Sequence, residues 1–137
     1  KSRYAPSIGR GMGDCMTKAA AIYNFWSSFG LPAYEENSVP NEAEFPYITY
    51  QLVTSSFENE IILTASLWYR GSSWVEINQK TEEISKNIGL CGKVIACDNG
   101  KIWLKRGSIF AQSMGDNKDS LIKRKYINLS AEFFTAD

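Results

Sequence analysis

The hydrophobic positions of residues 17–30 repeat with the period of an α-helix. The apolar side chains share one helical face: Ile22, Phe25, Trp26 and Phe29. Thr17 stands before this pattern and is suited to accept a hydrogen bond from the first helical turn. Gly30 and Pro32 follow it in the order typical of a helix end. The pattern predicts a helix from Thr17 with an aromatic face in the core.

A second helical pattern occupies residues 74–88. Ser73 and Glu76 have the spacing of a capping box, in which each side chain accepts a hydrogen bond from the backbone N–H of the other residue. Gly89 is placed to end the helix. The predicted buried face consists of Trp74, Ile77, Thr81, Ile84 and Ile88.

Alternating apolar and polar residues predict strands in three other regions. Residues 47–53 and 60–69 are rich in β-branched and aromatic side chains, and their short connector favours an antiparallel hairpin. Residues 124–134 alternate in the same way. In the second of these strands, Trp68 belongs to the less apolar face.

A further hairpin is predicted from Lys93 to Leu104. Its turn contains Asn99-Gly100, a pair that favours the positive φ angles of a type I′ turn. The polar stretch from Gln112 to Asp119 is interpreted as a mobile loop.

Residues 31–46 are interpreted as an exposed, semi-rigid loop. They contain three prolines and four glutamates, Glu35, Glu36, Glu42 and Glu44, without the spacing of a calcium loop. We interpret them as a solvated acidic loop that contacts a basic partner surface.

The order of elements indicates an α+β fold. Two helices would pack on one face of a mostly antiparallel sheet of about five strands. The other face and the sheet edges would then need cover, and a neighbouring subunit is one solution. We expect residues 1–15 to form a flexible N-terminal arm or extension, and residues 16–137 to form a single domain.

Composition narrows the functional classes. Lys+Arg and Asp+Glu are each 15, so the formal net charge is zero, which argues against non-specific nucleic-acid binding as the main role. The chain has no histidine, which removes the commonest general base and transition-metal ligand. Neither a phosphate-binding glycine loop nor a Gly-x-Ser-x-Gly motif occurs. We therefore predict no enzymatic activity, catalytic residue, metal or cofactor.

Cysteines and hydropathy bear on location. Cys15, Cys91 and Cys97 form no paired pattern, and we interpret Cys91 and Cys97 as small apolar residues buried in a strand, in a reducing compartment. No apolar run approaches the roughly 20 residues that cross a bilayer, and no signal-peptide pattern opens the chain. The sequence therefore predicts neither a membrane protein nor an exported one.

The C-terminal segment from Asp119 to Phe134 carries a resemblance. Its basic run Lys123-Arg124-Lys125 and the alternating residues after it look like the closing segment of tail terminator proteins of long-tailed phages and prophages. Phe45 to Tyr50 resembles the entry to their first strand, and residues 74–89 stand where these proteins place a helix. The resemblance runs from about Met16 to the C-terminus, and residues 1–15 depart from it.

This resemblance implies a virion subunit assembled in the host cytoplasm. Such subunits form a homo-oligomeric ring, commonly a hexamer, that caps the head-proximal end of the tail tube and joins tail to head. Its partners would be the major tail tube protein and a head-completion or connector protein, with DNA only passing through the channel. Candidate subunit-interface residues are Trp68, Tyr69 and Arg70. Candidate contacts to tube or connector are Glu35, Glu36, Glu42, Glu44, Arg106, Lys123 and Arg124.

Two alternatives remain open from the sequence. The chain is also compatible with another phage connector, such as a head-completion or minor tail protein, which differs only in the partner bound. A small-ligand-binding or enzymatic α+β domain would instead be a monomer or dimer with aromatic side chains around a deep apolar cavity.

Overall fold

The computed structural model describes residues 16–56 and 59–136, which form two helices and six strands. The predicted arm, residues 1–15, lies outside the described residues. The elements in chain order are α1 (Lys18–Ser27), β1 (Ala33–Glu35), β2 (Tyr47–Tyr50), β3 (Asn59–Arg70), α2 (Val75–Ile88), β4 (Lys93–Cys97), β5 (Gly100–Gly115) and β6 (Ile122–Thr135).

The α+β class is confirmed, and the sheet is larger than expected. Its strand order is β1-β2-β3-β6-β5-β4, and β1 pairs parallel to β2 while all other described pairs are antiparallel. The sheet is therefore mixed and six-stranded. β1 falls in the segment that was expected to be a loop, although Ala33 is buried beside Ile48. A strand of three residues is too short to show an alternating apolar and polar pattern in the sequence. It is recognised as a strand only by its pairing with β2.

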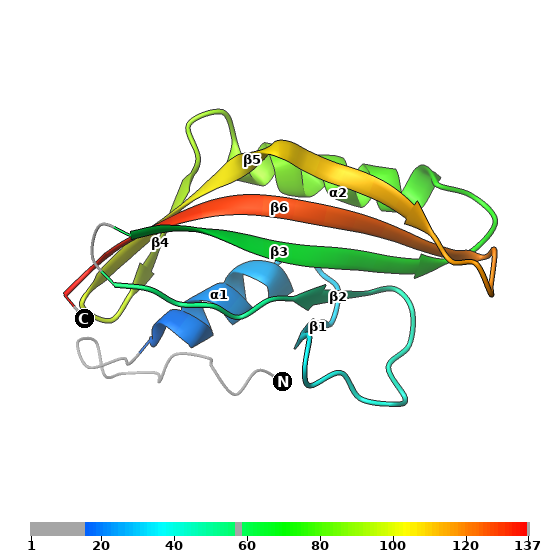
Figure 1. Ribbon diagram of the computed structural model, residues 1–137, viewed down its shortest axis with the longest axis horizontal. Helices are drawn as coiled ribbons and strands as arrows, with labels where there is room; N and C mark the ends of the chain where they lie inside the picture. The colour runs from blue at the N-terminus through cyan, green and yellow to red at the C-terminus, as the bar shows by residue number, and fades with distance from the viewer. Residues whose placement is uncertain (1–15, 57–58, 137) are drawn as a thin grey trace.

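The sheet curves into a half-barrel, and both helices pack on its concave face (Figure 1). α2 lies across β3, β5 and β6, while α1 contacts both edge strands, β1 and β4. One core cluster joins the two helices to the sheet. The two-helix layer predicted for one face is thus present, and neither described helix lies on the convex face.

The start of α1 follows the prediction. The Thr17 hydroxyl accepts a hydrogen bond from the Ala20 N–H at 3.0 Å and caps the helix. The aromatic face is buried, with Trp26 only 1% exposed and its ring 4.9 Å from that of Phe25. The segregation of aromatic side chains to one face therefore identified the side of α1 that meets the sheet.

The start of α2 differs from the predicted capping box. Trp74 is the last residue before the helix, and the Ser73 hydroxyl accepts from the Val75 N–H at 3.0 Å. Ser73 thus closes a local turn and does not cap Glu76. The rest of the helix is as expected: Ile77, Thr81, Ile84 and Ile88 are buried, and Gly89, with φ 78°, ends the helix. Trp74, the remaining residue of the predicted face, is half-buried.

The β4–β5 hairpin is confirmed, but its turn is different. Cys97 pairs with Gly100, so the two loop residues are Asp98 and Asn99. Asn99, with φ 64°, is the only non-glycine residue with positive φ among those described. A type I′ turn needs positive φ at both loop residues, so this expectation was wrong.

β5 extends well beyond the predicted end of the hairpin. Residues 112–115 pair with residues 123–126 of β6, so the first part of the expected mobile loop is strand. β4 covers β5 only up to Leu104. The rest of β5 pairs with β6 alone and is an edge of the sheet. Polar side chains are tolerated at an edge because it faces water.

The cysteine interpretation requires a correction. Cys91 is exposed in the turn before β4, and Cys97 is half-buried at the end of that strand. Gly89 and Gly92, both with positive φ, turn the chain around Cys91 and keep it out of the strand. In the described part of the chain, no helix combines the length and apolarity needed to span a membrane.

Candidate functional site: the open face of the sheet

The convex face of the sheet, here called the open face, exposes large apolar side chains. Alternation along β3 directs Leu63, Ala65 and Leu67 into the core and sends the residues between them to the open face. Exposure is 67% for Ile62, 64% for Ile109, 55% for Val94 and 38% for Phe134. Apolar area of this kind is typical of a surface that receives a partner.

One end of the open face carries a row of aromatic rings with an arginine among them. The ring centroids of Tyr34 and Tyr47 lie 5.9 Å apart, and those of Tyr47 and Trp68 lie 6.3 Å apart and are stacked. The Arg124 guanidinium lies 4.9 Å from the centroid of Trp68 and 5.3 Å from that of Tyr126. We call these five residues the aromatic–arginine row.

Strand register produces this row. Tyr47 of β2 is the partner of Trp68, and Trp68 is in turn the partner of Arg124 on β6. Directly opposed side chains on one face are close enough to interact. The Trp68 indole N–H also donates to the Thr49 hydroxyl at 2.9 Å, which orients the ring.

A groove of about 510 Å³ runs along the row. Its walls are polar and aromatic: Glu36, Thr49, Gln51, Thr64, Trp68, Arg124 and Tyr126 are among them. Burial, and secondarily the nearby Tyr34, raise the pKa of Tyr47, so this phenol stays protonated at neutral pH. The groove can therefore donate and accept hydrogen bonds, and Arg124 is its cation.

The middle of the open face contains a bulge in the pairing of β5 with β6, which the sequence pattern did not predict. Between the pairs Arg106–Leu129 and Ala111–Ile127, residues 107–110 of β5 stand opposite Asn128 alone. The Asn128 amide donates to the Ile109 carbonyl oxygen at 3.1 Å and holds the bulge. Its one sequence signal is a glycine inside a strand, Gly107, where a Cβ would lie 2.9 Å from the Asn128 carbonyl oxygen.

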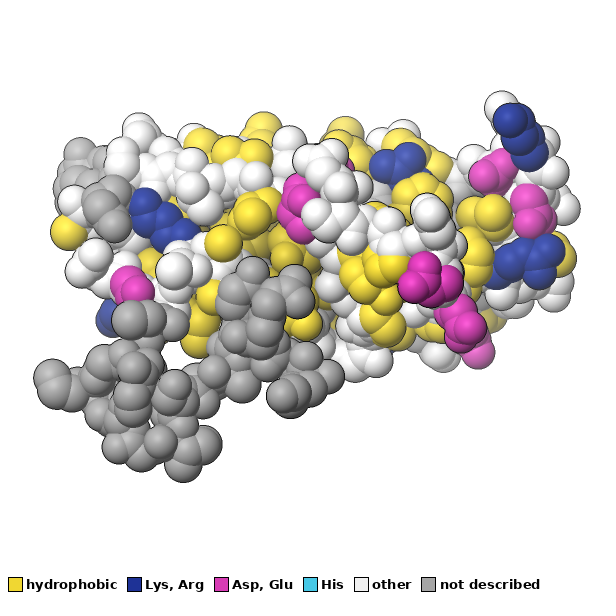
Figure 2. Space-filling model, turned by 90° about the horizontal axis from the view of Figure 1, so that it is seen from below, with side chains coloured by type: hydrophobic (Ala, Val, Ile, Leu, Met, Phe, Trp, Pro, Cys, Tyr) yellow, Lys and Arg dark blue, Asp and Glu magenta, His cyan; other side chains and the backbone are white. Residues whose placement is uncertain are grey.

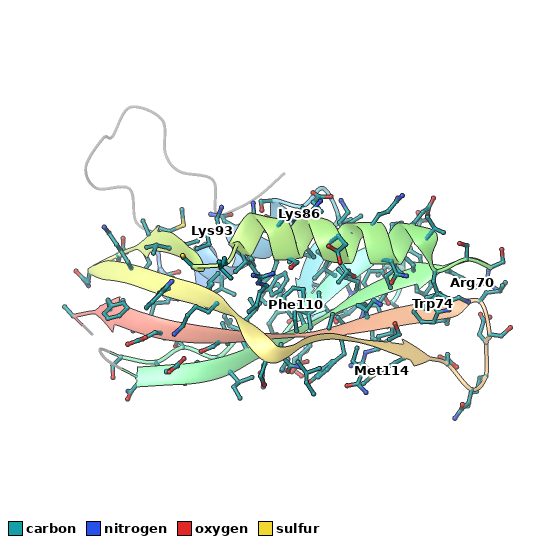
Figure 3. All side chains as sticks on the ribbon, turned by 90° about the horizontal axis from the view of Figure 1, so that it is seen from above. Arg70, Trp74, Lys86, Lys93, Phe110 and Met114 are labelled. Atoms are coloured by element: carbon teal, nitrogen blue, oxygen red, sulfur yellow. The ribbon has the colours of Figure 1, made fainter. Side chains whose placement is uncertain are left out.

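This irregularity has consequences for both faces. Phe110 turns toward the core, where it packs on the side of α2 (Figure 3). Ile109 instead stands out on the open face and borders, with Ile62, a hollow of about 570 Å³. The bulge therefore adds apolar surface to the open face.

The three predicted interface residues do not share one surface. Trp68 lies on the open face, whereas Tyr69 points to the helix-covered face and packs against the core. Burial, and then the charges of Glu76 and Glu83, raise the pKa of Tyr69. Arg70, at the end of β3, shares one end of the molecule with Trp74 (Figure 3).

The basic run splits between the two faces of β6. Arg124 is on the open face, while Lys123 is only 7% exposed and lies 5.6 Å from the Trp74 ring. Its ammonium donates to the Ser120 carbonyl oxygen at 2.7 Å. Lys123 is therefore not a solvated surface lysine, because its stem packs beneath the start of α2. Arg106, also on the helix side, donates to the Ser85 hydroxyl at 2.8 Å.

The acidic candidates differ in their local contacts. Glu35 accepts hydrogen bonds from the side chains of Asn37 and Ser38. Glu36 borders the groove. Glu42 and Glu44 are exposed, and neither carboxylate forms a hydrogen bond or ion pair within the described chain.

An ion pair at the end of β3 makes stability depend on pH. Asp119 accepts from the Leu121 N–H at 3.0 Å and pairs with Arg70 at 3.1 Å, and these contacts lower the pKa of Asp119. Its contribution is therefore present above the unfolded pKa of about 4 and is lost as pH falls through the lower folded value. We expect the difference in free energy of unfolding between wild type and Asp119→Asn to shrink as pH falls from 6 to about 2. Urea titrations across that range measure it, and a difference independent of pH would contradict the assignment.

No group of three or more His, Cys, Asp or Glu side chains within the described residues is placed to hold a metal ion. The absence of catalysis and of a cofactor stays a prediction. A comparison with models of known protein families and a search of curated proteins both give no match to this chain.

Proposed function

We propose that the chain is a structural subunit that assembles with copies of itself through the open face. The observation that carries the proposal is that both helices of the described residues cover the same side of the sheet. Its uncovered side exposes Ile62, Ile109 and Val94 by more than half. Burying such side chains against a neighbour releases about 25 cal/mol for each Å² of apolar surface removed from water.

Two properties favour assembly over small-ligand binding. The hollows of about 510 and 570 Å³ lie along the outside of the sheet, whereas two hollows between α1 and the edge strands are about 240 Å³ each, and the core cluster packs between the helices and the sheet. A ligand-binding domain would place its aromatic side chains around an internal cavity. The formal net charge of zero also gives copies of the chain little mutual repulsion.

We further propose that the assembly is a ring of the phage tail terminator kind. This finer statement rests on the resemblance of residues 16–137 to that family. The ring would cap the head-proximal end of the tail tube, with the tube protein on one side and a connector protein on the other. Its action would be geometric, since each subunit adds a fixed contact surface and the closed ring stops further growth.

Light scattering over a range of concentrations and negative-stain imaging test the proposal. We expect rings, or subunits that cap the ends of added tail tubes. Ile62→Glu should abolish assembly because it places a charge in an apolar contact. Val75→Glu is the matched control, since Val75 is 58% exposed on α2, away from the open face, and should leave assembly intact.

A wild-type chain that stays monomeric at all concentrations and ignores tubes would overturn the proposal. Rings that bind purified connector but not tubes would retain self-assembly and identify the chain as a different phage connector.

A further inference from the structure

The Arg124 side chain is held in place on three sides. The rings of Trp68 and Tyr126 flank its guanidinium at 4.9 and 5.3 Å, and its Nε donates to the Ser66 hydroxyl at 2.9 Å. In the described chain, no carboxylate pairs with this guanidinium, and neither terminal nitrogen has an acceptor. Arg124 therefore presents a fixed cation with unused donors to the groove.

A guanidinium in this state suits a carboxylate. Its planar fork makes two parallel hydrogen bonds to the two oxygens of a carboxyl group. Because the stacked rings already restrict the side chain, little conformational entropy remains to be lost on binding. The groove of about 510 Å³ leaves room for an incoming side chain.

The same chain carries carboxylates without partners. Residues 31–46 contain four glutamates and neither lysine nor arginine. This segment projects from one end of the molecule between β1 and β2 (Figure 1), and Figure 2 shows acidic side chains on the underside at that end. Glu36, Glu42 and Glu44 are its exposed glutamates whose carboxylates lack hydrogen bonds in the described chain, and of these Glu36 alone borders the groove of its own chain.

We infer that Arg124 binds the carboxylate of Glu42 or Glu44 from a second copy of the chain. The inference rests on the proposed self-assembly and names one of its contacts. A fixed donor and free acceptors occur on one chain without pairing there, so a neighbouring copy satisfies both. The contact is charged and partly exposed, and rising salt therefore weakens it.

A peptide of residues 34–46 tests recognition without requiring ring formation. Trp68 lies against Arg124, so its fluorescence reports on the groove. We expect the peptide to bind the full chain, and Arg124→Gln to weaken binding at least tenfold. Arg106→Gln is the matched control, because Arg106 is an exposed arginine that lies on the helix side. A peptide with glutamine at all four glutamate positions should not bind.

Charge exchange in the full chain tests the contact in the assembly. Arg124→Glu alone and Glu42→Arg/Glu44→Arg together should each reduce assembly at least tenfold, and a chain with all three changes should recover it. Circular dichroism of each variant checks folding, and Arg124→Lys, which keeps the charge but loses the fork, should give a partial loss.

The outcomes separate the inference from the proposed function. Wild-type rings that are unaffected by Arg124→Glu would overturn the inference and leave self-assembly standing. A monomeric wild type that binds the peptide through Arg124 would overturn the ring and leave the recognition of the acidic segment standing. Failure of the peptide to bind, or equal binding by the glutamine peptide or by inorganic phosphate, would overturn the inference.

Discussion

Replacement of Trp26 by alanine is expected to lower the free energy of unfolding by about 3–5 kcal/mol. Trp26 is 1% exposed and is the largest fully buried side chain of the described core. Its ring lies 4.9 Å from that of Phe25 and 6.5 Å from that of Phe29. Alanine would leave a cavity where α1 closes the curved sheet, and rigid neighbours would fill it only in part.

Such a loss is a large fraction of the 5–15 kcal/mol that stabilises a typical domain. Urea titration followed by circular dichroism measures it, and Val75→Ala, at an exposed position of α2, should change stability by no more than about 0.5 kcal/mol. A loss below about 1 kcal/mol for Trp26→Ala would mean that α1 does not seal the core.

Gly100→Ala is expected to destabilise the protein by about 3 kcal/mol. A Cβ at Gly100 would lie 1.9 Å from the Phe134 carbonyl oxygen and 2.8 Å from the Thr135 Cα. Both are backbone atoms of the neighbouring strand β6, so the clash is relieved only by separating the strands. The change therefore opens the sheet where the β4–β5 hairpin meets the C-terminal end of β6.

Gly115→Ala provides the control for this prediction. Gly115 ends the same strand, but a Cβ there would meet nothing within 4 Å. We expect its effect on the free energy of unfolding to stay within about 0.5 kcal/mol. Thermal unfolding of the two variants side by side measures the contrast, and equal stabilities would contradict the close approach of β5 and β6 at Gly100.

Elements whose signals are local could be predicted from the order of the residues alone. The aromatic face behind Thr17, the apolar face of residues 74–88 and the hairpin at Asn99 each depend on neighbours within about one turn or one loop. Their hydrogen bonds form within the element, so the order of the residues was sufficient. Alternation in β3 and β6 likewise predicted which side chains leave the core.

Elements that depend on a partner strand could not be predicted in this way. β1 has three residues and is a strand because β2 lies beside it. Residues 112–115 at the end of β5 begin the stretch that was expected to be a loop, and they form a strand because they pair with β6. Neither segment has an alternating pattern of apolar and polar residues, so both were expected to be loops.

The candidate site shows the same division. The alternating pattern predicted that Trp68 points to the less apolar face of its strand. The register between β2, β3 and β6 then brings Tyr47, Trp68 and Arg124 together on that face. The two-residue period of β6 puts Lys123 on the opposite face from Arg124 and so divides a basic run that is continuous in the sequence. A chain specifies side-chain direction locally through the two-residue period of a strand. Which side chains meet is set by pairing between segments about 20 to 60 residues apart, which no local pattern records.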